Sequence, residues 1–382
     1  MDKLVELGSL ISAAKPVRCG TGKYPVLSMT MHDGLVFQDE KFKKVIASKD
    51  TSDYKVVYRN QLVISFPIDE GVLATQRIAD AGIVSPAYGI WDVDQSQIHP
   101  EFLEYALRSN RALQYYKAKL RGSTARRRSL PTPTLLAFTI PLPSLEEQKA
   151  ILDYIARAKS IIEKRKAQIF ELNELIKARF VEMFGDPNIN EKQWEKGKIN
   201  DVGTCVAGAT PSTNVNEYWE GGTIPWMSSG EVNKGRIYET DSFITQLGYD
   251  NASTKMVPAK TVVLAMAGQG KTRGTAAITE IELCTNQSIC SIVNNDRVNP
   301  EYLLFFLKLQ YKELRGASTN TDGRGGLNLK IIGNYSIMIP PIDLQNNFAE
   351  FVKQVDKSKS VVQKSLDEAR ILYDSLMQQY FG

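Results

Sequence analysis

Histidine and cysteine are scarce in this chain of 382 residues. The two histidines, His32 and His99, lie far apart in the sequence, which excludes a His-rich metal site and leaves little from which to build a Ser/His/Asp catalytic set. The cysteines fit neither a disulfide framework nor a zinc-binding spacing; they are Cys19, Cys205, Cys284 and Cys290. The sequence therefore predicts no metal site and no catalytic residues in this chain.

Long apolar runs are also missing. No stretch approaches the roughly 18–20 apolar residues that a membrane-spanning helix needs. The first 16 residues carry Asp2 and Glu6 where a signal peptide would be basic. We therefore expect a cytoplasmic protein with no membrane partner. The hydrophobic fraction of 43% excludes a disordered chain, and at roughly 100–200 residues per domain the length predicts two or three domains.

Acidic residues are absent from two basic tracts. The net charge of +4 is too small to indicate a partner by itself. Residues 108–128 and 251–279 contain Lys and Arg but neither Asp nor Glu, whereas residues 201–250 hold seven acids and two bases. Basic tracts on a nearly neutral chain indicate local contacts with an anionic partner, with a solvated helix face as the alternative.

An internal repeat with a period near 200 residues is the strongest pattern that the chain does contain. Any one match could arise by chance, but four segments recur in the same order with offsets that drift by only a few residues. The pairs are His99–Arg108 with Asn299–Lys308, Leu120–Gly122 with Leu314–Gly316, Ile140–Pro141 with Ile339–Pro340, and Phe184–Gly185 with Phe381–Gly382. This order predicts two tandem units.

Each repeat has the same predicted layout. Short β-rich runs, such as 55–58, 62–66 and 261–266, alternate with glycine-containing turns. A short helix with proline at its first position, a basic loop, a proline-bearing strand and a long helix follow. The predicted fold class is α+β, with two globular α/β domains in tandem repeat separated by two long helices. The expected boundaries are 1–143 and 186–342 for the domains, and 144–185 and 343–382 for the helices.

Neither proline nor glycine interrupts residues 145–184 or 344–381, so each segment is predicted to form a helix roughly 60 Å long. Ser144 and Glu147 form a capping-box pattern, and Asp343 is the predicted N-cap of the second helix. A 4-3 spacing of apolar residues continues along both helices, with one basic position in each, Arg165 and Lys359. Matching seams predict a coiled coil. We expect an antiparallel pair with pseudo-two-fold symmetry, and a parallel pair remains compatible with the sequence.

The segment 265–272 fits a loosened phosphate-binding-loop pattern, with Ala265 in place of the first glycine. That loop requires a helix that begins at Lys271, whereas Gly274 and the β-branched residues after it favour another strand. We expect a strand–turn–strand with an exposed basic tip. The alternative is an NTPase that uses Gly270-Lys271-Thr272, and it fails if the purified protein binds no nucleotide.

The loops 121–129 and 316–326 occupy the same place in the two repeats but differ in composition. Arg can hydrogen-bond guanine bidentately and Asn can bond adenine, while Lys, Ser and Thr mostly contact phosphates. A shared frame with different loops suits the recognition of two different short DNA sequences, with ordinary solvated loops as the alternative. The candidate DNA-contacting residues are Arg121, Ser123, Thr124, Arg126, Arg127, Arg128, Ser228, Ser229, Lys271, Arg273, Asn320 and Arg324.

Several short motifs follow one another in a fixed order along the chain. Residues 140–148 lead into a helix that ends at 184–187, and residues 339–345 lead into one that ends at 381–382. The second domain adds four motifs: Gly-Ala-Thr-Pro-Ser at 208–212, Ile-Pro-Trp at 224–226, Asn-Gln at 286–287 and Asn-Pro-Glu-Tyr-Leu at 299–303. Over essentially its whole length the chain resembles the DNA-specificity (S) subunit of type I restriction–modification enzymes. The first domain lacks the Thr-Pro-Ser and Ile-Pro-Trp elements, so we expect the two recognition surfaces to differ.

The resemblance implies a non-catalytic DNA reader, whose two target-recognition domains each bind one half of a bipartite, asymmetric target. It also implies that the paired helices set the gap between the halves and bind two methyltransferase (modification) subunits, which use S-adenosylmethionine. Two restriction subunits would add translocation and cleavage, with ATP and Mg²⁺; this chain itself would bind no cofactor. The candidate partner-binding residues are Ile151, Ile155, Ile162, Phe351, Val352 and Leu366.

A rod of the predicted length could hold two DNA readers about one helical turn of duplex apart, roughly 34 Å. The alternative function is a coiled-coil scaffold that carries two protein-binding domains and contacts no nucleic acid. Salt dependence separates these two functions, because a DNA reader loses affinity steeply as the salt concentration rises.

Overall fold

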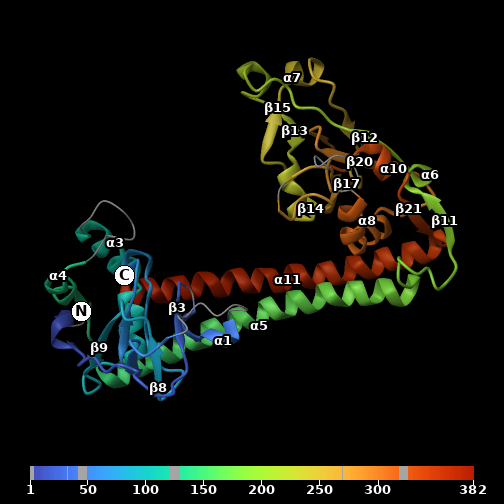
Figure 1. The fold of residues 1–382 in the computed structure, drawn as a ribbon. Coiled ribbons are helices and arrows are strands. Elements are labelled where there is room, and N and C mark those ends of the chain that lie inside the picture. Colours follow the sequence, from blue (N-terminus) through green and yellow to red (C-terminus); the bar gives the residue numbers. More distant parts are fainter. Residues whose placement is uncertain (1–3, 32, 42–49, 121–129, 269, 318–325) are drawn as a thin grey trace. The chain divides into compact units, whose positions relative to one another are not determined.

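The computed structural model describes residues 4–31, 33–41, 50–120, 130–268, 270–317 and 326–382. The chain divides into two compact units, residues 1–166 with 364–382 and residues 167–363. Each unit holds one α/β domain together with half of each long helix. These helices are α5 (Leu145–Phe184) and α11 (Ile342–Phe381) (Figure 1).

The domain of the first unit is built on small antiparallel sheets. Its four-stranded sheet has the order β2-β9-β6-β7. The strands predicted within 55–58 and 62–66 are confirmed as β5 and β6. The strands of that sheet are β2 (Ile11–Ala13), β9 (Gly89–Val93), β6 (Leu62–Ile64) and β7 (Leu73–Thr75). The two-stranded sheets pair β1 (Leu4–Glu6) with β10 (Thr139–Pro141), β3 (Leu27–Thr30) with β4 (Gly34–Phe37), and β5 (Lys55–Tyr58) with β8 (Ala81–Val84).

Helices connect the sheets of the first unit to the long helices. Phe102 and Tyr116 are fully buried in a core that also contains Ile155 from α5 and Phe381 from α11. The ring of Phe381 lies 4.9 Å from that of Phe102. The short helices are α1 (Gln38–Lys41), α2 (Pro100–Leu107), α3 (Asn110–Lys119) and α4 (Thr132–Leu136).

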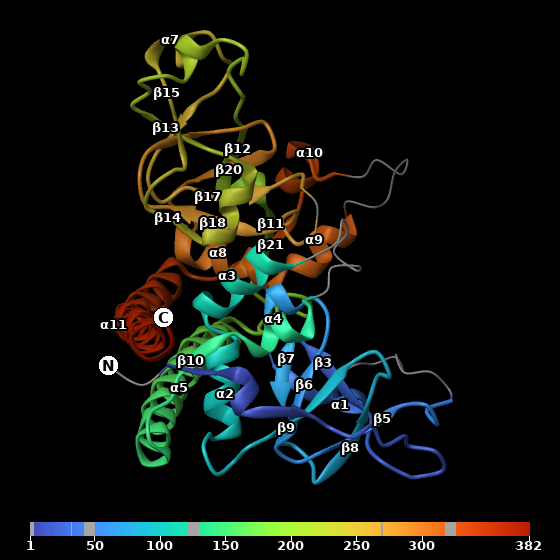
Figure 2. The ribbon, with the colours of Figure 1, turned by 90° about the vertical axis from the view of Figure 1, so that its left-hand side faces the viewer.

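The domain of the second unit contains a five-stranded and a four-stranded sheet. Figure 2 shows β13 and β15 of the four-stranded sheet at the end of this domain away from α8. The five-stranded order is β12 (Gly203–Ala207), β20 (Ile289–Asn294), β17 (Val262–Ala265), β18 (Ala276–Thr279) and β14 (Arg236–Ile237); the four-stranded order is β15 (Ser242–Ile244), β13 (Ile224–Met227), β19 (Leu283–Thr285) and β16 (Met256–Val257). The remaining elements are β11 (Glu195–Lys198), β21 (Ser336–Ile339), α6 (Ile199–Val202), α7 (Gln246–Asp250), α8 (Pro300–Leu309), α9 (Tyr311–Ala317) and α10 (Leu329–Gly333).

The predicted tandem repeat is confirmed in hydrogen-bond detail. In the first unit the buried side chain of Gln148 accepts from the His99 N–H at 2.8 Å and donates to the carbonyls of Gln97 and Pro143. In the second unit Gln345 accepts from the Asn299 N–H at 2.8 Å and donates to the carbonyls of Arg297 and Pro340. Each glutamine thus ties the first turn of a long helix to the start of a short one, α2 or α8.

The two long helices pair antiparallel. In the first unit the start of α5 shares a core with the end of α11, and Arg165 donates to Ser365 Oγ at 3.1 Å. In the second unit the end of α5, with Phe180 and Phe184, packs against Phe348 near the start of α11. This opposite order in the two units confirms the antiparallel prediction. None of the positions at the predicted 4-3 spacing is exposed; they are Ile151, Ile155, Ala158, Ile162, Arg165, Ile169, Leu172 and Ile176 on α5, and Phe348, Val352, Val355, Lys359, Val362, Leu366, Ala369, Tyr373, Leu376 and Tyr380 on α11.

The start of α11 differs by one residue from the prediction. The helix begins at Ile342, because the carbonyl of Pro341 accepts from the N–H groups of Leu344 and Gln345. Asp343 is therefore not the N-cap; it lies inside the first turn, where its negative charge suits the positive end of the helix dipole. The predicted capping box of α5 is confirmed, since the N–H of Ser144 donates to Glu147 at 2.8 Å and that of Glu147 to Ser144 Oγ at 3.3 Å.

Candidate nucleic-acid interface

Three loops meet at one edge of the second domain. Strands β13 and β19 are parallel neighbours, so the loops that follow them leave the sheet on the same side. The N–H of Asn286 in the second loop donates to the carbonyl of Met227 at 3.1 Å, and the N–H of Met266, after β17, donates to Ser288 at 2.8 Å. The predicted residues Ser228 and Ser229 belong to this edge, which we call the loop edge.

The family-like motifs of the second domain contact one another at the loop edge. The indole N–H of Trp226 donates to the carbonyl of Ala209 at 3.0 Å, and the hydroxyl of Thr210 donates to Gln287 Oε1 at 2.5 Å. A Cβ on Gly208 would collide with the carbonyl of Thr285, so this approach requires glycine. Segments 208–212, 224–226 and 286–287 therefore form one local structure that holds the exposed Gln287 outward.

The turn between β17 and β18 presents the predicted basic residues. Lys271 is exposed and Arg273 is half-buried. The turn leads into β18 at Ala276, which confirms the predicted strand–turn–strand with a basic tip. Among the described residues of this segment no helix begins at Lys271, so the turn does not have the phosphate-loop geometry that an NTPase would need.

Two α9 residues that the sequence analysis missed hold this turn. Arg315 donates to the carbonyl of Gly270 at 2.6 Å, and the hydroxyl of Tyr311 donates to the carbonyl of Lys271 at 2.9 Å. The Arg315 guanidinium also lies 5.5 Å from the centre of the Tyr311 ring. These contacts fix the backbone of the turn and leave the Lys271 side chain exposed.

A buried acid shapes the turn that carries Ser228 and Ser229. Glu231 is 4% exposed and accepts the N–H of Ser228 at 2.8 Å and that of Asp241 at 3.0 Å. Its carboxylate also binds Lys234 at 3.0 Å. Hydrogen bonds from Lys234 to Asp241 and Glu231 raise the pKa of this lysine, so it stays charged next to the loop edge.

Eight of the twelve predicted DNA-contacting residues lie outside the described residues, so their role stays a prediction; they are Arg121, Ser123, Thr124, Arg126, Arg127, Arg128, Asn320 and Arg324. Among the described residues on either side of 121–129, Tyr115 Oη of α3 donates to the carbonyl of Thr134 in α4 at 2.8 Å. Two arginines earlier in the basic tract serve the fold instead. Arg108 binds Glu104 at 3.4 Å, and Arg111 donates to the carbonyl of Thr139 and lies over the Phe138 ring.

The predicted partner-binding residues lie mostly inside the chain. Ile151, Ile155, Val352 and Leu366 are buried, and Ile162 and Phe351 are half-buried. Packing of the two long helices on each other and on the domains accounts for this burial, and a contact of these residues with a partner stays a prediction. The apolar side chains that the long helices do expose are different ones, among them Tyr154, Phe170, Val361 and Ile371.

Fold and site together define a protein with two related α/β domains on paired antiparallel helices, one domain of which presents a polar loop edge with basic residues. The family model described as the type I restriction modification DNA specificity domain matches residues 4–172 and 191–369. The two matches cover both repeats and most of the chain. The chain therefore belongs to the family of type I restriction–modification DNA-specificity proteins.

Individual relatives agree with this assignment. The MjaIX specificity subunit of Methanocaldococcus jannaschii is 32% identical over 161 residues, which are 40% of this chain and 36% of the relative. The putative MjaX specificity subunit of the same organism is 22% identical over 294 residues, 72% of this chain and 65% of the relative. Less than two thirds of either relative is thus matched. The S subunit structure from M. genitalium shares the fold, with a TM-score of 0.60 at 16% identity over 100% of this chain and 96% of that chain.

Within the described part of the chain, no helix is long and apolar enough to span a bilayer. In the same residues, no group of three or more His, Cys, Asp or Glu side chains lies close enough together to share a metal ion.

Proposed function

We propose that this chain is the DNA-specificity subunit of a type I restriction–modification complex, in which each α/β domain binds one half of a bipartite target. The observation that carries the proposal is the duplicated domain on antiparallel helices, with three loops of the second domain converging on Ser228, Lys271 and Gln287. Exposed Lys271 suits a phosphate, and an amide such as that of Gln287 suits an adenine edge.

The long helices supply the proposed docking surface for partner subunits. Tyr154, Phe170, Val361 and Ile371 are between 52% and 69% exposed, although each is an apolar or aromatic side chain on a helix whose seam is already covered. Contiguous exposed apolar patches are typical of surfaces that bind another protein, and these side chains are the candidates for such a patch, Tyr154 and Ile371 in the first unit and Phe170 and Val361 in the second. We assign the modification subunits to this surface, with two such subunits and two restriction subunits per complex.

The chemistry of the complex belongs to those partners in this proposal. The modification subunits use S-adenosylmethionine to methylate adenine, and the restriction subunits use ATP and Mg²⁺. This chain contributes no catalytic residue and acts in the cytoplasm, where the DNA and the partner subunits are found.

A salt titration tests the DNA-binding proposal. The chain, purified with its modification subunit, is used to select duplexes from a random pool, and the affinity for the selected duplex is measured across a range of salt concentrations. We expect the logarithm of the binding constant to fall linearly with the logarithm of the salt concentration, because each Lys or Arg bound to a phosphate releases counterions. Lys271→Ala should reduce that slope by about one while leaving the selected sequence unchanged.

Two results would contradict this proposal. Affinity that does not change with salt, or a pool from which no sequence is selected, would favour the scaffold with two protein-binding domains. Glu239→Gln, a change at an exposed carboxylate of the same domain that cannot pair with a phosphate, serves as the control and should leave the slope as it is.

A further inference from the structure

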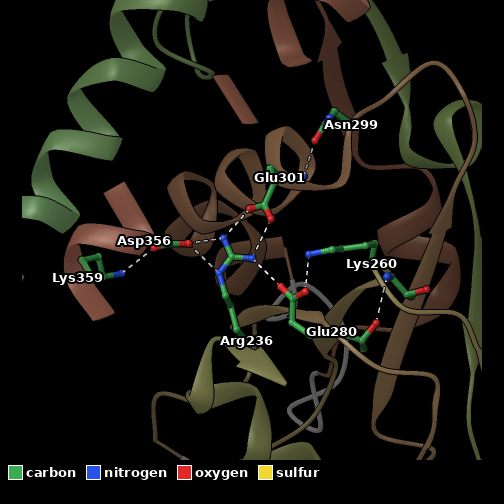
Figure 3. Close-up of polar contacts among 9 residues, drawn as sticks. Arg236, Lys260, Glu280, Asn299, Glu301, Asp356 and Lys359 are labelled. Carbon is green, nitrogen blue, oxygen red and sulfur yellow. Dashed lines mark hydrogen bonds and ion pairs between the residues drawn. The ribbon is translucent and has the colours of Figure 1, made fainter. Parts of the chain in front are cut away.

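Arg236 is the centre of a charge network in the second unit (Figure 3). Its guanidinium forms a two-pronged contact with Glu301, with both bonds at 2.8 Å, and a third bond to Glu280 at 2.9 Å. The same group binds Asp356 at 2.6 Å, and its Nε donates to Asp356 at 2.9 Å. Since the Arg236 side chain is only 19% exposed, water screens these contacts little.

The network joins three separate parts of the fold. Arg236 lies on β14, the edge strand of the five-stranded sheet, and Glu280 follows the neighbouring strand β18. Glu301 lies in the first turn of α8, and Asp356 lies on the long helix α11. The ion pairs of one planar guanidinium therefore connect the sheet edge of the recognition domain both to α8 and to α11.

The charged groups around Arg236 make its ion pairs specific. Lys260 binds Glu280, and Lys359 binds Asp356 at 3.3 Å, so each of these carboxylates has a second cation (Figure 3). Burial acts to lower the pKa of Arg236, but the hydrogen bonds and charges of Glu301 and Asp356 outweigh it and raise that pKa above its ordinary value. Arginine thus stays charged at every relevant pH, and its fork fixes the direction of the carboxylates as well as their distance.

The first unit has a link at the equivalent place, built from different chemistry. Glu101 occupies the repeat position of Glu301, and Arg77 binds it at 2.9 Å. On α5 the position equivalent to Asp356 is Lys159, whose ammonium lies 4.7 Å from the ring centre of Tyr105 on α2 and 5.8 Å from that of Tyr373 on α11. Both repeats therefore link the short helix that follows the sheets to the same position of the long helix. In the second unit Glu301 and Asp356 share Arg236, and in the first unit Lys159 makes a cation–π contact with Tyr105.

We propose that Arg236 and Asp356 are positioning residues, which hold the second recognition domain at a fixed angle on α11 and so fix the gap at which the second half-site is accepted. The proposal rests on the function proposed above. Neither residue needs to touch DNA: a domain free to rock on α11 would present its loop edge at several offsets, and duplexes with a wrong gap would then bind almost as well as the correct one.

Asp356→Asn is the test variant, because it removes the negative charge that α11 presents to Arg236 and leaves the contacts of Arg236 with Glu301 and Glu280 in place. The variant is purified in complex with the modification subunit. Its affinity is measured for the duplex selected by the wild-type complex and for duplexes whose gap is one base pair longer or shorter. We expect the preference for the correct gap to fall about fivefold or more, with both half-site sequences unchanged.

Two further variants separate positioning from general stability. Asp356→Glu keeps a carboxylate and should restore at least part of the gap preference. Glu350→Gln removes an exposed carboxylate from the same helix, one that pairs with Lys353 at 3.5 Å and not with Arg236, and should leave the preference unchanged. Melting temperatures of all three variants are measured alongside.

A gap preference that stays at the wild-type value in Asp356→Asn would overturn the proposal, as would an equal loss in Glu350→Gln. If Asp356→Asn does not fold, the gap preference of Lys159→Met is measured in its place. An unchanged gap preference in Lys159→Met would contradict the equivalence of the two repeats at this position and would overturn the proposal. A wild-type complex that shows no gap preference at all is a different result: it defeats the bipartite function itself, and the role of Arg236 falls with it.

Discussion

Single buried polar side chains connect the long helices to the domains. Gln148 and Gln345 are fully buried, and each makes three hydrogen bonds to backbone groups at the junction of a long helix, a strand end and a short helix. An apolar side chain of similar size would fill the same space but leave one N–H and two carbonyl groups without partners. Unpaired buried groups cost more than the hydrogen bonds themselves contribute, because they lose their hydration as well.

We therefore predict that Gln345→Leu lowers the free energy of unfolding of the second unit by roughly 2–4 kcal/mol. Urea denaturation followed by the fluorescence of the second unit's tryptophans measures this change. Gln354→Leu, the same substitution at an exposed position of α11, is the matched control and should change the stability by less than about 0.5 kcal/mol. Equal effects in the two variants would show that the buried hydrogen bonds do not hold the junction.

Element by element, the sequence predicted the structure where the signal is local. The runs 55–58 and 62–66 contain adjacent β-branched residues and form β5 and β6, and Pro100 and Pro300 begin α2 and α8. The direction of helix pairing stayed open, because a 4-3 apolar spacing looks the same along parallel and antiparallel pairs. The structure decides it, because the end of α5 contacts the start of α11 through Phe184 and Phe348, and the start of α5 shares a core with Phe381 at the end of α11.

The loop edge illustrates what a sequence alone does not reveal. Lys271 and Ser228 were predicted as candidates from their loops, but Thr210 and Gln287 meet because β12, which Thr210 follows, pairs with β20, which Gln287 precedes. The role of Arg315 was missed for the same reason: its partners are backbone carbonyls about 45 residues earlier in the chain, which no local pattern marks. The loops 121–129 and 316–326 that the repeat marked stay a prediction, whereas the sheet order determines which side chains gather at the loop edge.

Shortening both long helices tests their role as a spacer. Removal of one turn from each helix around the Arg165–Ser365 contact shortens the pair by about 5.4 Å, which corresponds to one or two base pairs of duplex. We predict a preferred gap shorter by that amount and unchanged half-site sequences, as read by duplex selection with the shortened complex. An unchanged gap would contradict the spacer role. Removal of one turn from α11 alone should instead unpair the seams and lower stability.

At the scale of the whole molecule, the two units give one chain two related recognition domains that differ in detail. The second domain has a five-stranded sheet and a Gly-Ala-Thr-Pro-Ser motif at its loop edge, whereas the first is built on shorter sheets and lacks that motif. A protein with two unlike domains of one design suits a target whose two halves have different sequences. The long helices, by contrast, have the same glutamine hydrogen-bond pattern in both units.

A genome-wide map of adenine methylation tests this account most directly, in cells that express the chain together with its modification subunit. We predict methylation at one motif made of two short, different sequences with a fixed gap between them, and no such motif when the chain is omitted. Methylation at a single continuous motif, or a pattern that stays the same without this chain, would contradict the central claim.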